Sequence, residues 1–403
     1  MYINCNTQSI VLYIQRRWRD GYCWDPGKAL RPTAPVRLMP GRVDRFRQLL
    51  SKGVLMLCFL RFAHIAAAVA VTIGLASPVA ARADDAEKVV NIYSSRHYPS
   101  DDQIYQLFTQ KTGIQVKVIQ GKAEELLERI KLEGESSPAD LFITVDAGNL
   151  WRAEEDKLLQ PIQSEELEDN VPANLRDPQG RWFAFSERAR VIIYDKNKVK
   201  TKQLSTYEAL ADPKWQGDIL VRSSNNIYNQ SLVAAMIDSI GEEKTEAWAK
   251  GLVENFARKP QGGDIEQIKA LVGGEGTIAI SNTYYFARLL AGKDEQLKKS
   301  LEHVAVFFPN QQDRGTHINI SGAGVVVNAP HKGNAISFLE FLVSPDVQRL
   351  LTDINFEYPV RSDVAPNAII AAWGTFKADS LHVSALGKNN PAAVELMDRV
   401  GWR

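Results

Sequence analysis

The chain has 403 residues, with 48 basic side chains, 48 acidic side chains and three cysteines. This length exceeds one ordinary hydrophobic core and is typical of two lobes. Residues 1–83 hold 12 Lys/Arg and 3 Asp/Glu, so the rest of the chain keeps 36 basic and 45 acidic residues. A net charge near −9 disfavours nucleic acid and anionic membranes as partners.

An uncharged apolar run covers Ile65–Ala76, and the small-residue site Ala81-Arg82-Ala83 follows it. A short apolar run with this kind of site is typical of a secretory signal peptide, and the run is too short for a comfortable membrane span. The sequence therefore predicts a signal peptide over residues 56–83, cleaved near Ala83, and export to the periplasm.

Residues 1–55 precede this predicted signal and are expected to be a start-site artefact or a disordered extension, outside the fold. The cysteines all lie before the cleavage point, at Cys5, Cys23 and Cys58. The exported protein is therefore expected to have no disulfide and no thiolate site. It is expected to be soluble, because no run after Ala83 approaches a membrane span, and to be a monomer.

The first part of the exported chain alternates between strand-like and helix-like patterns. Strands are predicted at 89–93, 115–119 and 141–145, and amphipathic helices at 101–112 and 123–133. This alternation is typical of an α/β fold with a largely parallel sheet.

Two later runs are predicted to cross between lobes. Ala189–Asp195 (ARVIIYD) is expected to leave the first lobe, and Gly322–Asn328 (GAGVVVN) to return to it. We therefore predict a two-lobed binding protein in which each lobe has a mixed, mostly parallel sheet flanked by helices, and two hinge strands join the lobes. The predicted boundaries are 84–188 for the first part of lobe 1, 189–314 for the first part of lobe 2, 315–365 for the return segment of lobe 1, and 366–403 for the C-terminal helices of lobe 2.

Adjacent tyrosines, Tyr284 and Tyr285, follow the predicted strand 277–281, and His97-Tyr98 follows the first strand. Tyr228 follows Ser-Asn-Asn, which is typical of a helix entry, and a helix is predicted over 230–240. In such folds, strand ends and helix starts face the ligand cleft. A tyrosine hydroxyl keeps its proton up to about pH 10 in water, and a strongly charged bound cation makes its loss favourable near neutrality. Ferric iron is the biological ion that most readily has this effect.

The chain from Val89 to Arg403 resembles the periplasmic ferric-iron-binding proteins of bacterial ABC importers, especially their tyrosine-rich cyanobacterial-type branch. The resemblance rests on a combination of segments, each of them weak alone. They are 93–98 (YSSRHY), 137–140 (SPAD), 144–150 (TVDAGNL), 224–230 (SNNIYNQ), 281–285 (SNTYY), 317–325 (HINISGAGV) and 357–360 (EYPV).

The resemblance implies a type II-like binding-protein fold, ferric iron as the cargo and an ABC transporter permease as the partner. It implies metal ligation by five residues: His97, Tyr98, Tyr228, Tyr284 and Tyr285. Some relatives place a glutamate ligand where this chain has Val145, and this departure leaves a carboxylate ligand and a synergistic anion in doubt. The neighbouring Asp146 is predicted to point to the opposite face of a strand.

Each residue also has an ordinary interpretation. The chain has twelve tyrosines, most of which must be packing residues, and a lone histidine in a turn is often solvated. Arg288 follows Tyr284 by four residues, so a helix would place it on the same face, where it could offset the charge of bound phenolates. Arg188, near the predicted hinge, is a second candidate for this role.

Three functions remain open from the sequence. The first is capture of ferric iron, with ferrous iron as an alternative, for delivery to an ABC importer. The second keeps the fold but binds an organic cation or an oxyanion through the tyrosines. The third, an exported hydrolase, has little support because the chain lacks G-x-S-x-G and a histidine set with catalytic spacing. We therefore expect no enzymatic activity.

Overall fold

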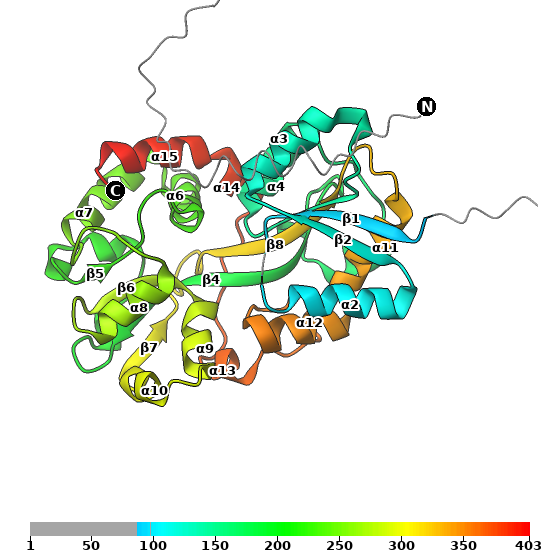
Figure 1. Ribbon diagram of the computed structural model, residues 1–403. Helices are drawn as coiled ribbons and strands as arrows, with labels where there is room; N and C mark the ends of the chain where they lie inside the picture. The colour runs from blue at the N-terminus through cyan, green and yellow to red at the C-terminus, as the bar shows by residue number, and fades with distance from the viewer. Residues whose placement is uncertain (1–86, 97) are drawn as a thin grey trace, which may run out of the picture. The chain divides into compact units, whose positions relative to one another are not determined.

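The structure is a computed structural model that describes residues 87–96 and 98–403. His97, the predicted signal peptide, its cleavage site and all three cysteines lie outside the described residues. Within the described part, one sheet carries strands in the order β2-β1-β3-β8-β4-β6-β5, with β7 paired to β4 (Figure 1). The strands are β1 (Val89–Ser94), β2 (Gln115–Gln120), β3 (Leu141–Thr144), β4 (Phe183–Asp195), β5 (Ile219–Leu220), β6 (Ile278–Asn282), β7 (Val304–Phe307) and β8 (Ile318–Val325).

The sheet is flanked by helices (Figure 1). They are α2 (Asp101–Thr112), α3 (Ala123–Glu133), α4 (Ala147–Glu155), α5 (Glu165–Asn170), α6 (Ile227–Ile240), α7 (Glu242–Glu254), α8 (Asp264–Val272), α9 (Thr283–Ala291), α10 (Glu295–Leu301), α11 (Lys332–Leu342), α12 (Pro345–Leu350), α13 (Ala368–Ala371), α14 (Ser384–Lys388) and α15 (Asn390–Arg399). None of those described helices is long and apolar enough to cross a membrane.

Strand pairing divides the sheet into two lobes. In lobe 1, β1 pairs in parallel with β2 and β3, and β8 pairs with β3 and with the first half of β4. In lobe 2, the second half of β4 pairs with β6 and β7, and β5 pairs in parallel with β6. The predicted two-lobed α/β class is confirmed. Antiparallel pairs are more numerous than predicted because every one of them involves a crossing strand, β4 or β8. The predicted residue boundaries of the lobes stay a prediction.

The two crossing strands begin earlier than the sequence pattern predicts. β4 starts six residues before Ala189, and β8 starts four residues before Gly322 and ends at Val325. Their early residues include buried polar side chains, among them Arg188 and Asn319, which are 1% and 5% exposed. These polar residues interrupt the apolar pattern on which strand prediction rests.

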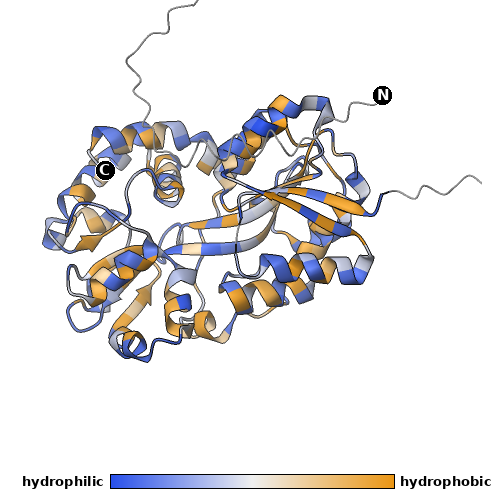
Figure 2. Ribbon diagram, viewed as in Figure 1, coloured by the Kyte–Doolittle hydropathy of each residue, from blue (hydrophilic) through white to orange (hydrophobic). Residues whose placement is uncertain are grey.

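Hydrophobic residues concentrate on the strands of both lobes, and most helices carry both hydrophobic and hydrophilic residues (Figure 2). A separate core cluster in lobe 2 contains Trp215, Trp248 and Trp402. The rings of Trp248 and Trp402 have centroids 6.4 Å apart at a steep angle. Each lobe thus has buried apolar contacts of its own, and the strands β4 and β8 connect them.

Candidate metal centre

Tyr98 lies in the short connection between β1 and α2. Its backbone amide donates a hydrogen bond to Asp101 Oδ2 at 2.7 Å. The guanidinium carbon of Arg96 lies 4.2 Å from the centre of the Tyr98 ring. Arg96 is held in turn by Asp101 and Glu357, each at 2.9 Å, and all three of these charged side chains are buried. The ring of Tyr98 therefore lies against an ion-paired arginine. This contact favours a defined position for the Tyr98 hydroxyl.

Tyr228 lies in the first turn of α6. The side chain of Asn226 caps this helix by accepting a hydrogen bond from the Tyr228 amide at 3.2 Å, and asparagine is a favoured residue at this position. The sequence predicted that the helix starts at Gln230, whereas it starts at Ile227. Tyr228 therefore lies at the positive end of the helix dipole, which favours a negative charge nearby.

Tyr284 and Tyr285 lie in the first turn of α9, directly after β6. The Tyr284 side chain is fully buried, and Tyr285 is partly buried. Adjacent side chains at a helix start commonly diverge, but these two rings have centroids only 4.2 Å apart. The short strand-to-helix connection therefore presents two phenols side by side.

The structure brings the hydroxyls of three tyrosines into one cluster. Tyr98 donates a hydrogen bond to the hydroxyl of Tyr284 at 3.4 Å, and Tyr284 donates to that of Tyr228 at 3.3 Å. Tyr285 joins the cluster through its ring contact with Tyr284. Tyr98 comes from lobe 1 and the other three from lobe 2, so the predicted phenols meet at the junction between the lobes.

Burial favours the protonated form of these phenols. It raises the pKa of Tyr98, Tyr284 and Tyr285 above the ordinary tyrosine value, and the negative charge of Tyr228 would raise each further. The cation Arg188 lowers the pKa of Tyr98 and Tyr284, but less strongly. Without a bound cation, Tyr98, Tyr284 and Tyr285 are therefore neutral near pH 7.

Besides Arg96, three guanidinium groups face the tyrosine rings. Arg188 lies 5.6 Å and Arg222 5.7 Å from the centre of the Tyr228 ring. Arg288 lies 5.0 Å from the Tyr98 ring and 4.9 Å from the Tyr284 ring. The structure thus places both predicted arginines, Arg188 and Arg288, beside the tyrosines. The nitrogen atoms of Arg188 are buried and have no hydrogen-bond partner among the described residues.

Arg222 and Arg96 were missed by the sequence analysis. Arg222 lies two residues after β5, at the end of a strand in lobe 2, and the position of this strand end was the available signal. Arg96 lies between β1 and Tyr98. One of its carboxylate partners, Glu357, is distant in the sequence, and the other, Asp101, is the first residue of α2. No local pattern would have revealed that arrangement.

Two other predicted positions have different roles. Asp146 was expected on a strand, but β3 ends at Thr144 and Asp146 caps α4, accepting a hydrogen bond from the Gly148 amide at 2.7 Å. Its carboxylate is fully buried and also accepts from Asn319 at 2.7 Å. Val145 lines a cavity of about 560 Å³. His97 lies outside the described residues, so its ligation stays a prediction.

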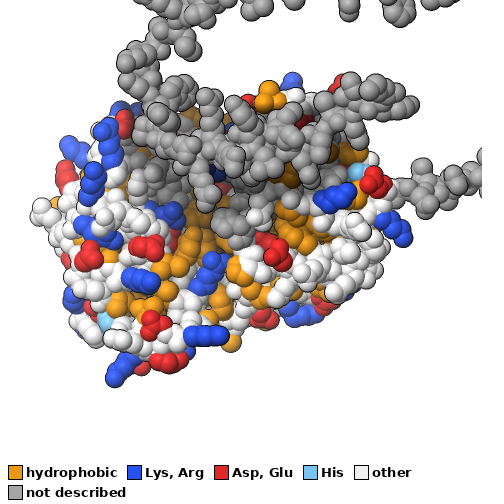
Figure 3. Space-filling model, viewed as in Figure 1, with side chains coloured by type: hydrophobic (Ala, Val, Ile, Leu, Met, Phe, Trp, Pro, Cys, Tyr) orange, Lys and Arg blue, Asp and Glu red, His pale blue; other side chains and the backbone are white. Residues whose placement is uncertain are grey.

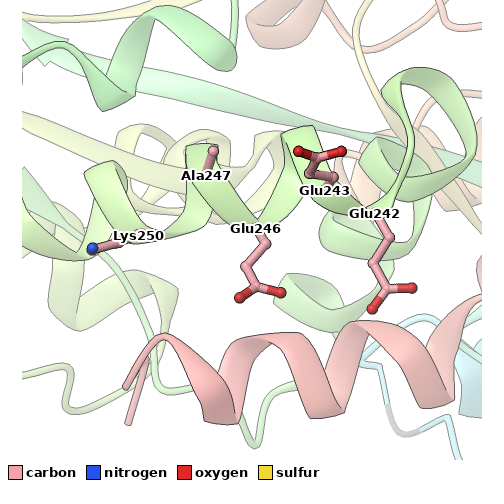
Figure 4. A pocket seen from close by; sticks show the side chains of 5 residues that line it. All are labelled: Glu242, Glu243, Glu246, Ala247 and Lys250. Atoms are coloured by element: carbon pink, nitrogen blue, oxygen red, sulfur yellow. The ribbon is translucent and has the colours of Figure 1, made fainter.

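Carboxylates also gather away from the tyrosines, along α7. No group of three or more His, Cys, Asp or Glu residues within 87–96 and 98–403 could hold a metal ion. A shallow cavity along α7 is lined by Glu242, Glu243, Glu246, Ala247 and Lys250 (Figure 4). Glu242 and Glu246 accept hydrogen bonds from Arg399 of α15. On the visible described surface, acidic and basic side chains are interspersed (Figure 3). The α7 carboxylates are therefore part of an ordinary charged surface.

A family model described as bacterial extracellular solute-binding protein matches residues 136–375. The iron uptake protein A1 of Synechocystis is 54% identical over 317 residues, covering 79% of this chain and 88% of that protein. The major ferric iron-binding protein of Neisseria meningitidis is 28% identical over 319 residues, and the aligned region covers 78% of this chain and 93% of that protein.

Solved structures are similar to the same part of the chain. A Trichodesmium structure described as IdiA or FutA in complex with iron and citrate ligands has a TM-score of 0.75 at 54% identity, and covers 78% of this chain and all of that one. The structure of apo FutA2 from Synechocystis has a TM-score of 0.74 at 49% identity, with 78% and 99% coverage.

Proposed function

The chain belongs to the bacterial extracellular solute-binding proteins, in the group that includes the cyanobacterial iron uptake proteins, and we propose that it captures ferric iron between its two lobes. The observation that carries this proposal is the cluster formed by the hydroxyls of Tyr98, Tyr284 and Tyr228, at 3.4 Å and 3.3 Å. Phenolate oxygens are hard donors that suit a small, highly charged ion. A relative named as a ferric iron-binding protein and a similar structure described with iron and citrate ligands support the same cargo.

The proposed ligands are Tyr98, Tyr228, Tyr284 and Tyr285, with His97 as a further candidate. A ferric ion with four phenolates carries one negative charge, which is costly to bury unless cations lie nearby. Arg188, Arg222 and Arg288 supply positive charge within 6 Å of the rings. They offset the charge of the iron centre and favour loss of the phenol protons when iron binds.

The two lobes give the proposed site its mechanism. Tyr98 belongs to lobe 1, and the other three tyrosines belong to lobe 2. The ion therefore completes its coordination only when the lobes approach each other. Differential affinity for the closed form then drives closure about β4 and β8. The closed form presents both lobes together to a partner, and we propose that this partner is the permease of an ABC importer, with the periplasm as the place of action.

A coloured complex tests this function. Ferric iron bound by phenolates absorbs visible light, whereas the same fold holding an organic cation or an oxyanion would stay colourless. The purified chain, freed of iron and then mixed with ferric citrate, is expected to develop a visible band in proportion to bound iron. A colourless protein after this addition would favour the alternative ligands. The relatives are solute-binding proteins, which agrees with a binding function rather than catalysis.

A further inference from the structure

Arg190 lies on β4 in lobe 2, and its guanidinium connects the two segments that carry the lobe 2 tyrosines. Arg190 Nη2 donates to Asn229 Oδ1 at 2.6 Å, and Nη1 donates to Asn282 Oδ1 at 2.9 Å. Asn229 directly follows Tyr228 in α6, and Asn282 precedes Tyr284 by two residues, at the end of β6 and directly before α9. One buried fork of donors therefore joins both helix starts.

Asp264, the first residue of α8, completes this connection. Its Oδ1 accepts from Arg190 Nη1 at 3.1 Å and from the Asn282 amide at 3.2 Å. Its Oδ2 accepts from Arg222 Nη1 at 2.8 Å. Arg190, Asp264, Asn229 and Asn282 are each 3% exposed or less. Since buried charges are costly unless paired, the pair fixes one arrangement of these groups.

Strand pairing alone does not determine the distance between Tyr228 and Tyr284. Arg190 lies opposite Asn282 in the β4–β6 register, which places α9 relative to the sheet. Helix α6 is not part of the sheet. The hydrogen bond from Arg190 to Asn229 connects this helix to the paired strands β4 and β6. Asn229 also donates to the carbonyl oxygens of Arg222 and Ser223, at 2.8 and 3.2 Å, so the loop before α6 is held as well.

We propose that Arg190 and Asp264 are positioning residues, which hold Tyr228 and the Tyr284–Tyr285 pair at the spacing that iron requires. The proposal rests on the proposed ferric-binding function. With this spacing fixed, lobe 2 is a preformed half-site of three phenols, which can hold iron before Tyr98 arrives from lobe 1. Buried ion pairs contribute little to stability compared with apolar residues of similar size, so a role in fixing geometry explains this pair better than a role in stability.

The test uses Arg190→Lys, which keeps the charge but cannot bridge both asparagines. Residues that orient metal ligands typically affect affinity by about 10- to 100-fold. Iron affinity, measured by competition with citrate, is expected to fall by at least about tenfold, and the visible band should change in wavelength. Arg181→Lys is the control, because Arg181 is also an ion-paired arginine, held by Asp177 and Glu154, but it lies in lobe 1. It should leave both readouts unchanged.

A second variant covers the case in which Arg190→Lys does not fold. Asn229→Ser removes the acceptor for Arg190 and should change the band in the same direction. The proposal is overturned if the folded variants bind iron with the wild-type band and affinity while only their melting temperature falls. If the wild-type protein itself gives no coloured ferric complex, the proposed function fails, and this inference fails with it. A coloured wild-type complex with unaltered variants overturns the inference alone.

Discussion

The hydroxyl oxygens of Tyr98 and Tyr284 lie 3.4 Å apart, although the two residues are 186 positions apart in the chain and belong to different lobes. Their rings have centroids 5.9 Å apart, and the guanidinium of Arg288 lies about equally far from both rings. This relationship makes closure of the lobes and completion of the proposed site the same event. Removal of either hydroxyl should therefore affect both binding and closure.

Replacement of Tyr284 or Tyr285 by phenylalanine should strongly weaken iron binding without unfolding the protein. The substitution keeps the ring and its packing but removes the oxygen donor. We expect losses of at least about 100-fold in ferric affinity for each variant, because loss of a ligand should cost more than the roughly 10- to 100-fold typical for loss of a residue that only orients a ligand. His97→Ala should cost less. Circular dichroism should confirm that each variant is folded. Equal and small losses of affinity for all three variants would indicate that the tyrosines are only packing residues.

Iron binding should weaken as the pH falls. Burial raises the pKa of Tyr98, Tyr284 and Tyr285, so these phenols are protonated in the free protein at neutral pH. Ligation requires the deprotonated form, so each ligating phenol releases one proton, and the affinity for the free ion rises with pH. A pH-stat titration in unbuffered solution measures this release, after correction for the protons that ferric citrate itself takes up. No release would contradict phenolate ligation.

Arg288→Gln should move this pH dependence to higher pH. The guanidinium lies 4.9 Å from the Tyr284 ring, so its loss removes a charge that favours the phenolate form. We expect iron affinity at pH 7 to fall by about tenfold, which corresponds to about one pKa unit. Part of the loss should be recovered at higher pH. A loss that is independent of pH would show that Arg288 acts through packing.

Ser231→Ala should favour the open form. Ser231 on α6 donates to Asp146 Oδ2 at 2.8 Å, across the junction between the lobes, and both residues are buried. A hydrogen bond to a charged group contributes about 1.5–3 kcal/mol, and 1.4 kcal/mol is a factor of ten. Iron release should therefore be at least about tenfold faster.

Ser239→Ala is the control for this variant. Ser239 lies on the same helix but bonds to the Ala235 carbonyl within it. It should leave iron release unchanged. Solution scattering should show a larger radius of gyration for the iron-loaded Ser231→Ala protein than for the wild type; equal radii and equal release rates would show that this bond does not contribute to closure.

The sequence predicted most strands, several helices and the two-lobed class, because hydrophobic periodicity and strand-helix alternation are local signals. It placed Tyr98 and the Tyr284–Tyr285 pair at strand ends, where the structure has them. It placed the start of α6 three residues too late, because polar residues surround Tyr228 and no apolar period begins there. A helix cap supplied by Asn226 explains the earlier start.

The charged environment of the tyrosines was only partly predictable. Arg288 was found because a helix repeats every three to four residues. Arg190 and Asp264 were missed because their 3.1 Å contact joins residues 74 positions apart, which no local pattern encodes. Asp146 was misplaced for a related reason: its role as a helix cap depends on β3 ending at Thr144, one residue earlier than predicted.

Phenolates from both lobes are proposed to hold one ferric ion, and resonance Raman spectroscopy of the iron-loaded protein tests this arrangement most directly. Excitation within the visible band should enhance tyrosine ring vibrations, metal analysis should give one iron per chain, and Tyr98→Phe should reduce the tyrosine signal while leaving iron on lobe 2. A colourless protein that contains stoichiometric zinc, or an iron complex without enhanced tyrosine vibrations, would contradict the account.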